Sequence, residues 1–181
     1  MKNNEKERRS LVIVHTGEGK GKTTAAMGMA LRAVGHDFKV LMIQFIKGSW
    51  EYGELTAIKK LAPYFKIIPM GKGFTNLGNR KPNENDMKIA SHAWEFSKDQ
   101  IASGEYDMII LDEINYAVSY GLIPVEEVVE VVKSRPRHLH MVLTGRNAHP
   151  RIIEMADLVT EMKLIKHPFR SGIKAQEGIE F

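Results

Sequence analysis

The sequence predicts a doubly wound α/β domain with a mainly parallel sheet of about six strands and helices on both faces. Two observations support this expectation. Short apolar, β-branched runs recur along the chain, and stretches of helical pattern separate them. Continuous apolar runs are typical of strands that are buried on both faces, as parallel strands usually are. The alternation of such strands with helices indicates the doubly wound arrangement.

The expected elements follow one another in a regular order. Apolar runs predict strands at 11–15, 39–45, 108–111 and 141–144, a weaker strand at 65–69 and a sixth at 158–162. Helices are expected between them, at 22–34, 55–61, 85–103, 125–134 and 150–155. Residues 71–85 contain three glycines, four asparagines and a proline, which predicts a loop that is either functional or mobile.

Length and composition limit the possible classes of protein. At 181 residues the chain is expected to form one domain over 11–181, preceded by a flexible arm over 1–10. The absence of cysteine excludes disulfides, thiolate metal sites and a cysteine nucleophile, and it agrees with a cytoplasmic location. No apolar run approaches the roughly 18 residues that span a bilayer, and the charged start is unlike a secretory signal. We therefore expect no membrane association.

The net charge of +4 is spread along the chain and interleaved with acids. A modest positive balance suits a protein that holds polyphosphate. Because no basic stripe with interleaved aromatic residues is present, nucleic acid is a weak alternative and we expect no nucleic-acid partner.

The run Thr-Gly-Glu-Gly-Lys-Gly-Lys-Thr-Thr at 16–24, named here the phosphate loop, lies between the first strand and the first helix. Glycines let backbone N–H groups converge on phosphate oxygens, and the helix N-terminus adds partial positive charge. Lys22 can bridge the outer phosphates and Thr23 can reach Mg²⁺. Thr16 stands where the usual pattern has glycine, so the path of the loop over the phosphates need not be the common one. The candidate ATP-binding residues are Gly17, Glu18, Gly19, Lys20, Gly21, Lys22, Thr23 and Thr24.

Two further motifs follow later strands. Asp112 and Glu113 end the strand at 108–111, so they are expected at the carboxyl edge of the sheet, where oxygen ligands suit Mg²⁺. Either acid could bind the metal directly or through water. Arg146 follows the strand at 141–144 and could contact phosphate or ribose, or form a surface ion pair. These features predict a P-loop NTPase-like (RecA-like) domain that binds Mg–ATP.

Other catalytic patterns are absent from the sequence. It contains neither a Ser/His/Asp pattern, nor a His-Glu-x-x-His arrangement, nor a protein-kinase signature set. The residues alone therefore leave the acceptor of the reaction open.

Several motifs together resemble a known family. They are the phosphate loop with Ala25-Ala26, 30–35, 44–48, Gly53-Glu54, 73–75, 111–113, Arg135-Pro136, 143–146, 156–162, 166–168 and 172–180. They cover nearly the full chain, and their combination resembles the P-loop ATP:corrinoid adenosyltransferases. The resemblance implies that Co(I) of a reduced corrinoid attacks the 5′ carbon of ATP and that tripolyphosphate leaves. No side-chain nucleophile is then needed, because cobalt is the nucleophile and Lys22 supports the leaving group.

The resemblance also implies roles for residues and partners. Thr23, Asp112 and Glu113 would hold Mg²⁺ or Mn²⁺, and Arg32, Glu54 and Arg146 are further candidates for contacts with ATP. Phe74 is the candidate corrin-facing aromatic residue, although it could equally anchor the 71–85 loop. The expected partners are ATP, the corrinoid, an electron donor such as a reduced flavoprotein, and a second copy of the chain in a homodimer.

The chain departs from the family pattern at two places. Some members carry a second aromatic residue just after the Gly-Phe-Thr stretch, where Asn76 and Leu77 stand here. Leu77 or Trp50 could substitute for it. The N-terminal arm, which is thought to help cover the corrinoid in this family, is short.

Two other functions share these motifs. An ordinary P-loop phosphotransferase or ATPase would need the same phosphate loop and acidic pair. A non-catalytic module that carries corrinoid and is regulated by ATP would need them as well. Identification of the phosphate product and turnover with reduced corrinoid separate these alternatives.

Overall fold

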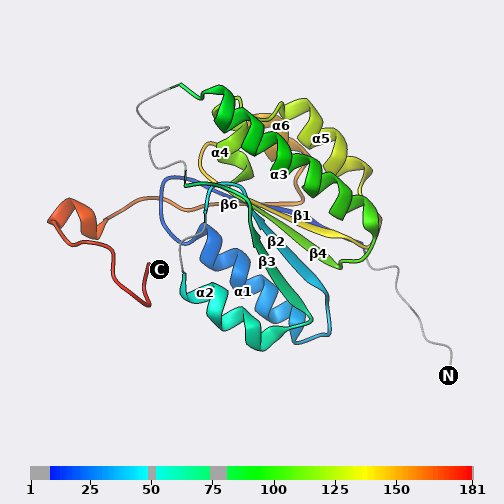
Figure 1. Ribbon diagram of the computed structural model, residues 1–181, viewed down its shortest axis with the longest axis horizontal. Helices are drawn as coiled ribbons and strands as arrows, with labels where there is room; N and C mark the ends of the chain where they lie inside the picture. The colour runs from blue at the N-terminus through cyan, green and yellow to red at the C-terminus, as the bar shows by residue number, and fades with distance from the viewer. Residues whose placement is uncertain (1–8, 49–51, 74–80, 181) are drawn as a thin grey trace.

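The computed structural model describes residues 9–48, 52–73 and 81–180, which form one six-stranded sheet with helices on both faces (Figure 1). The strand order is β3-β2-β4-β5-β1-β6, and every neighbouring pair is parallel. The strands are β1 (Val12–Thr16), β2 (Val40–Gln44), β3 (Phe65–Pro69), β4 (Met108–Asp112), β5 (His140–Thr144) and β6 (Leu158–Glu161). The predicted fold class is confirmed.

The helices divide between the two faces of the sheet. They are α1 (Lys22–Val34), α2 (Gly53–Ala57), α3 (Glu84–Ser103), α4 (Ile114–Ser119), α5 (Val125–Ser134) and α6 (Pro150–Met155), with 3₁₀ turns η1 (Ile58–Leu61) and η3 (Pro168–Ser171). Helices α1 and α2 cover one face, and α3, α4, α5 and α6 cover the other (Figure 1). Alternate strand residues therefore enter two separate apolar clusters, with Val12 and Val14 in the larger and Ile13 in the smaller.

The expectation that all strands are buried on both faces is wrong for β6. Each of its four residues is exposed, whereas β1, β2 and β4 are buried along their whole length. β6 lies at an edge of the sheet and has a neighbouring strand on one side only, although the other edge strand, β3, is largely buried or half-buried. The structure also adds α4 and η3, and it divides the helix expected at 55–61 into α2 and η1.

The strand order brings four loops to one edge of the sheet. The phosphate loop follows β1, Glu113 follows β4, Arg146 follows β5, and residues 45–48 follow β2. All four strands are parallel, so these segments meet at the carboxyl end of the sheet. Ligands of open α/β sheets bind at this end.

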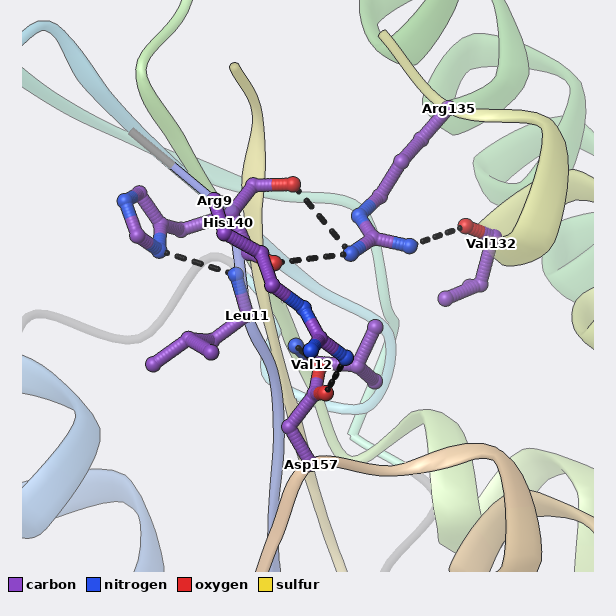
Figure 2. Close-up of polar contacts among 8 residues, drawn as sticks. Arg9, Leu11, Val12, Val132, Arg135, His140 and Asp157 are labelled. Atoms are coloured by element: carbon purple, nitrogen blue, oxygen red, sulfur yellow. Dashed lines mark hydrogen bonds and ion pairs between the residues drawn. The ribbon is translucent and has the colours of Figure 1, made fainter. Parts of the chain in front are cut away.

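The opposite end of β1 is held by side chains from neighbouring elements (Figure 2). The Val12 amide donates to Asp157 Oδ2 at 2.9 Å, and Arg9 donates to Oδ1 of the same carboxylate at 2.9 Å. The Leu11 amide donates to His140 Nδ1 at 3.1 Å. The start of β1 is thus tied to β5 and to the segment before β6.

Arg135 extends this network on the other side of β1 (Figure 2). Its guanidinium donates to the carbonyls of Val132 at 2.9 Å and Leu139 at 3.0 Å, and to Ser10 Oγ at 3.2 Å. It therefore joins the end of α5 to Ser10, two residues before β1.

We predict that Asp157→Ala lowers the free energy of unfolding by about 1–2 kcal/mol, because the Val12 amide loses its acceptor. Asp157→Asn keeps an acceptor oxygen and loses mainly the ion pair with Arg9, whose side chain is 83% exposed. We therefore expect a loss below about 0.5 kcal/mol for that variant. Urea unfolding of both variants tests this prediction, and equal losses would contradict it.

Candidate nucleotide-binding site

A cavity of about 900 Å³ opens at the carboxyl end of the sheet. Its wall is formed by the phosphate loop, one side of α1, and the segment that contains α2 and η1. The wall also includes Phe65, Glu113, Arg146, Lys47 and residues 178–180. One end of the cavity is thus polar and glycine-rich, and the other end, between α1 and α2, is largely apolar.

The conformation of the phosphate loop depends on glycines that pack against the end of β6. Gly17 has a φ of +95°, and the Gly19 amide donates to the Met162 carbonyl at 2.6 Å. A Cβ on either glycine would lie 2.6 Å from that carbonyl oxygen, closer than any real Cβ contact. Thr16 stays within β1, where its hydroxyl accepts a hydrogen bond from the Ala148 amide at 3.1 Å. The loop therefore starts its turn at Gly17, and Thr16 takes a structural place in the strand.

Lys22 lies inside the phosphate loop and is 7% exposed. Its ammonium donates to the carbonyls of Gly17 and Gly19, both at 2.7 Å. Burial lowers its pKa, and the nearby Glu113 carboxylate is the largest opposing influence. The loop thus carries a partly desolvated cation that phosphate oxygens can attract away from the two carbonyls.

The Asp112 carboxylate lies at the centre of a buried hydrogen-bond network. Thr23 and Thr144 hydroxyls donate to its Oδ1 at 2.8 Å and 2.7 Å. Gln44 Nε2 donates to Oδ2 at 3.2 Å, and the Thr144 hydroxyl accepts from the Glu113 amide at 2.9 Å. Residues of β2, β4, β5 and α1 are therefore joined through one carboxylate.

Glu113 lines the cavity and adopts a left-handed backbone conformation, with a φ of 66°. Burial raises its pKa to about 7, and the neighbouring Asp112 charge adds to this rise. The positive charges of Lys22, Arg146 and Lys47 act in the opposite direction. The strained backbone turns Glu113 toward the cavity while Asp112 stays beneath it.

Thr23, Asp112 and Glu113 fit a magnesium ion that is held mainly by substrate. The Thr23 hydroxyl donates its hydrogen bond to Asp112, so its oxygen lone pairs remain available to a cation. Within the described residues, no three His, Cys, Asp or Glu side chains cluster as metal ligands. Magnesium usually takes only one or two carboxylates and completes its shell with phosphates and water.

Two residues of the phosphate loop, Glu18 and Lys20, form ion pairs at the border of the cavity. Arg146 lies 3.0 Å from Glu18, and both side chains are about half exposed. Lys20 lies 2.9 Å from Glu180 near the end of the chain, so the C-terminal segment returns to the phosphate loop. Figure 1 shows this segment leaving β6 and turning back toward α2. Bound polyphosphate would compete with Glu18 and Glu180 for these cations.

The structure brings together most of the predicted site residues but separates others. Arg32 is exposed in the last turn of α1 and is not part of the described cavity wall. Glu54 lines the cavity, but its carboxylate lies 2.6 Å from Lys47 Nζ. Phe74 lies outside the described residues, as do Trp50, Asn76 and Leu77.

The polar residues of the site that the sequence did not reveal include Gln44, Lys47, Thr144 and Glu180. Each belongs to one of the motifs that carried the family resemblance. Only the fold shows what these side chains contact.

The helices of the described residues include none that is long and apolar enough to cross a membrane.

Comparison with known proteins identifies relatives over nearly the full chain. A family model described as ATP:corrinoid adenosyltransferase BtuR/CobO/CobP matches residues 8–181. A corrinoid adenosyltransferase of Sinorhizobium sp is 47% identical over 177 residues, covering 97% of this chain and 82% of that protein. A corrinoid adenosyltransferase of Escherichia coli K12 is 42% identical over 175 residues, covering 97% of this chain and 87% of that protein.

A solved structure shows the same fold with little sequence identity. The flagellar accessory protein FlaH from Methanocaldococcus jannaschii aligns with a TM-score of 0.55 at 14% identity. The alignment covers 84% of this chain and 70% of that one. At this identity the likeness supports the fold alone.

We predict that Glu113→Gln stabilises the metal-free protein above pH 7. The pKa of Glu113 rises from 4.5 to about 7 on folding, so the folded protein loses stability as the pH rises from 4.5 to 7. Glutamine removes this loss, which is on the order of 1–3 kcal/mol. Urea unfolding in EDTA should show the full gain at pH 8 and a smaller gain at pH 5. An equal gain at both pH values would contradict the assignment.

We also predict that Glu180→Gln tightens ATP binding by about two- to five-fold, because the partly exposed pair with Lys20 no longer competes with phosphate. Calorimetry without corrinoid measures this change. Glu177→Gln, an exposed residue of the same segment, is the matched control and should leave the affinity unchanged. A similar gain in both variants would indicate a general charge effect.

Proposed function

The chain belongs to the ATP:corrinoid adenosyltransferase family, and we propose that it transfers the 5′-deoxyadenosyl group of ATP to Co(I) of a reduced corrinoid. Tripolyphosphate is the second product. One structural observation carries the proposal: a phosphate loop with a buried Lys22 shares a single cavity with Thr23 and Glu113, above the fixed Asp112 carboxylate. The full-length match to the family provides the acceptor that the loop alone leaves open.

The reaction balances without a protein nucleophile. The electron pair of Co(I) forms the bond to the 5′ carbon, and cobalt becomes Co(III). The bond between this carbon and the ester oxygen breaks, and its electron pair stays on the tripolyphosphate, which gains one negative charge. The protein therefore needs to hold the polyphosphate, aim the 5′ carbon and stabilise developing negative charge.

The phosphate loop supplies the grip on the polyphosphate in this proposal. Lys22 exchanges the carbonyls of Gly17 and Gly19 for phosphate oxygens, and the backbone amides at the start of α1 add to the contact. Arg146 and Lys20 leave their acidic partners and face the same charge.

Thr23 and Glu113 are proposed to hold Mg²⁺ or Mn²⁺, and Asp112 orients Thr23 from behind. When bound, the divalent cation neutralises charge on the polyphosphate. Asp112 already accepts hydrogen bonds from Thr23, Thr144 and Gln44, so Glu113 has the more available carboxylate.

The proposal includes a homodimer, an electron donor such as a reduced flavoprotein, and a cytoplasmic location. Support for a dimer comes from exposed apolar side chains on β6 and in the segment after it. They are Leu158, Val159, Ile165, Phe169 and Ile173, with exposed fractions from 38% to 78%. Phe74 remains the proposed corrin-facing residue.

We predict that Lys22→Ala reduces corrinoid adenosylation by at least about 10²-fold, because a main contact to the leaving group is lost. The assay follows the absorbance of Co(I) corrinoid with Mg²⁺ and ATP and identifies the phosphate product. The wild-type protein should release intact tripolyphosphate.

Lys66→Ala, which changes an exposed residue of β3, is the control and should retain full activity. Circular dichroism shows whether each variant is folded. Release of ADP and phosphate by the wild-type protein, with cobalt left unalkylated, would instead identify a phosphotransferase or an ATPase.

A further inference from the structure

Lys47 is a cation of the cavity wall that lies apart from the phosphate loop. It follows β2, and its Nζ lies 2.6 Å from Glu54 Oε1 and 4.4 Å from the centre of the Tyr52 ring. The side chains of Lys47 and Glu54 are only 25% and 16% exposed. An ion pair this sheltered, with its ammonium against an aromatic face, is unlike the loose pairs of a solvated surface.

The strand order gives Lys47 a distinct position among the cations of the site. Along the sheet edge, β2 is followed by β4, β5 and β1. Lys47 therefore lies on one side of Glu113, while Arg146 and the phosphate loop lie on the other. Adjacent strands are roughly 4.8 Å apart, so β1 and β2 are separated by about 14 Å.

A nucleotide held in this cavity meets positive charge at two places. In the proposed complex its outer phosphates would bind the loop after β1, and the chain of phosphates would extend along the sheet edge toward Glu113, which lines the same cavity. The ester end, where the 5′ carbon is attached, would then lie on the side of the loop after β2. Lys47 is the cation that this loop contributes to the cavity wall.

We propose that Lys47 stabilises the negative charge that develops on the tripolyphosphate as the bond to the 5′ carbon breaks. The electron pair of that bond goes to the ester oxygen of the leaving group, and Lys47 faces this oxygen. Glu54 is a positioning residue that holds the ammonium in place through the 2.6 Å contact. This inference rests on the adenosyl transfer proposed above.

The proposal is tested with Lys47→Met in single-turnover reactions with pre-reduced corrinoid and saturating ATP. We expect the rate of cobalt alkylation to fall by about 10²-fold, as when one donor to a developing anion is removed. ATP carries one charge less than the leaving group, so the affinity for ATP should fall by less than about three-fold. The affinity for free tripolyphosphate, measured by calorimetry with Mg²⁺, should fall by about ten-fold or more.

Three further variants separate this role from a structural one. Lys47→Arg keeps the charge and should recover much of the rate. The double variant Lys47→Met/Glu54→Gln removes the unpaired carboxylate and should stay slow. Lys72→Met, an exposed lysine after β3, is the matched control and should behave as wild type.

Two results would overturn the proposal. Recovery of the rate in the double variant would show that Lys47 only neutralises Glu54. If Lys47→Met weakened the binding of ATP and of tripolyphosphate equally and left the rate of cobalt alkylation unchanged, Lys47 would only bind the polyphosphate. It would then not stabilise the leaving group in the transition state. Failure of the adenosyl transfer itself is distinguishable, because the wild-type protein would then release no tripolyphosphate.

Discussion

The buried Asp112 carboxylate is the interaction on which the site depends. It is 1% exposed, and burial of a charge is costly unless donors surround it. Here the donors are Thr23 at the start of α1, Thr144 at the end of β5 and Gln44 at the end of β2. Since these side chains come from separate elements, the carboxylate fixes the first turn of α1 against the sheet. The phosphate loop is held between this anchor and the contact of Gly19 with Met162.

The fixed charge of Asp112 also determines the chemistry of its neighbour. Asp112 accepts three hydrogen bonds, whereas Glu113 is turned into the cavity by a left-handed backbone and has its pKa raised to about 7. Gly145, at a φ of +127°, leaves space for the Glu113 side chain, since a Cβ on residue 145 would lie 3.1 Å from Glu113 Oε2. One carboxylate therefore organises the protein, and the other is free to respond to a cation and to substrate. This division would be lost if both acids were equally exposed.

The sequence was sufficient for the fold class and for the residues whose role is local. The helix at 22–34 and the strand at 65–69 were predicted with the bounds that the structure shows. Glycine spacing and the acidic end of β4 marked the site because phosphate and metal chemistry leave short-range patterns. The exposure of β6 was not predictable from its apolar residues, since it depends on the strand order. The pairs Lys20–Glu180 and Lys47–Glu54 were missed because only the folded chain brings these charges together.

The order of the strands has a chemical consequence beyond packing. A phosphoryl-transfer enzyme needs its positive charge around the outer phosphorus, which is the end gripped by the loop after β1. An alkyl transfer instead builds negative charge at the ester oxygen, at the far end of the same polyphosphate. A cation beyond Glu113, on the loop after β2, stands on the side of the cavity where we propose that far end to lie. In this proposal, the difference from a phosphoryl-transfer enzyme is the position of a positive charge along the same sheet edge. Cleavage of the carbon–oxygen bond then needs no nucleophilic side chain.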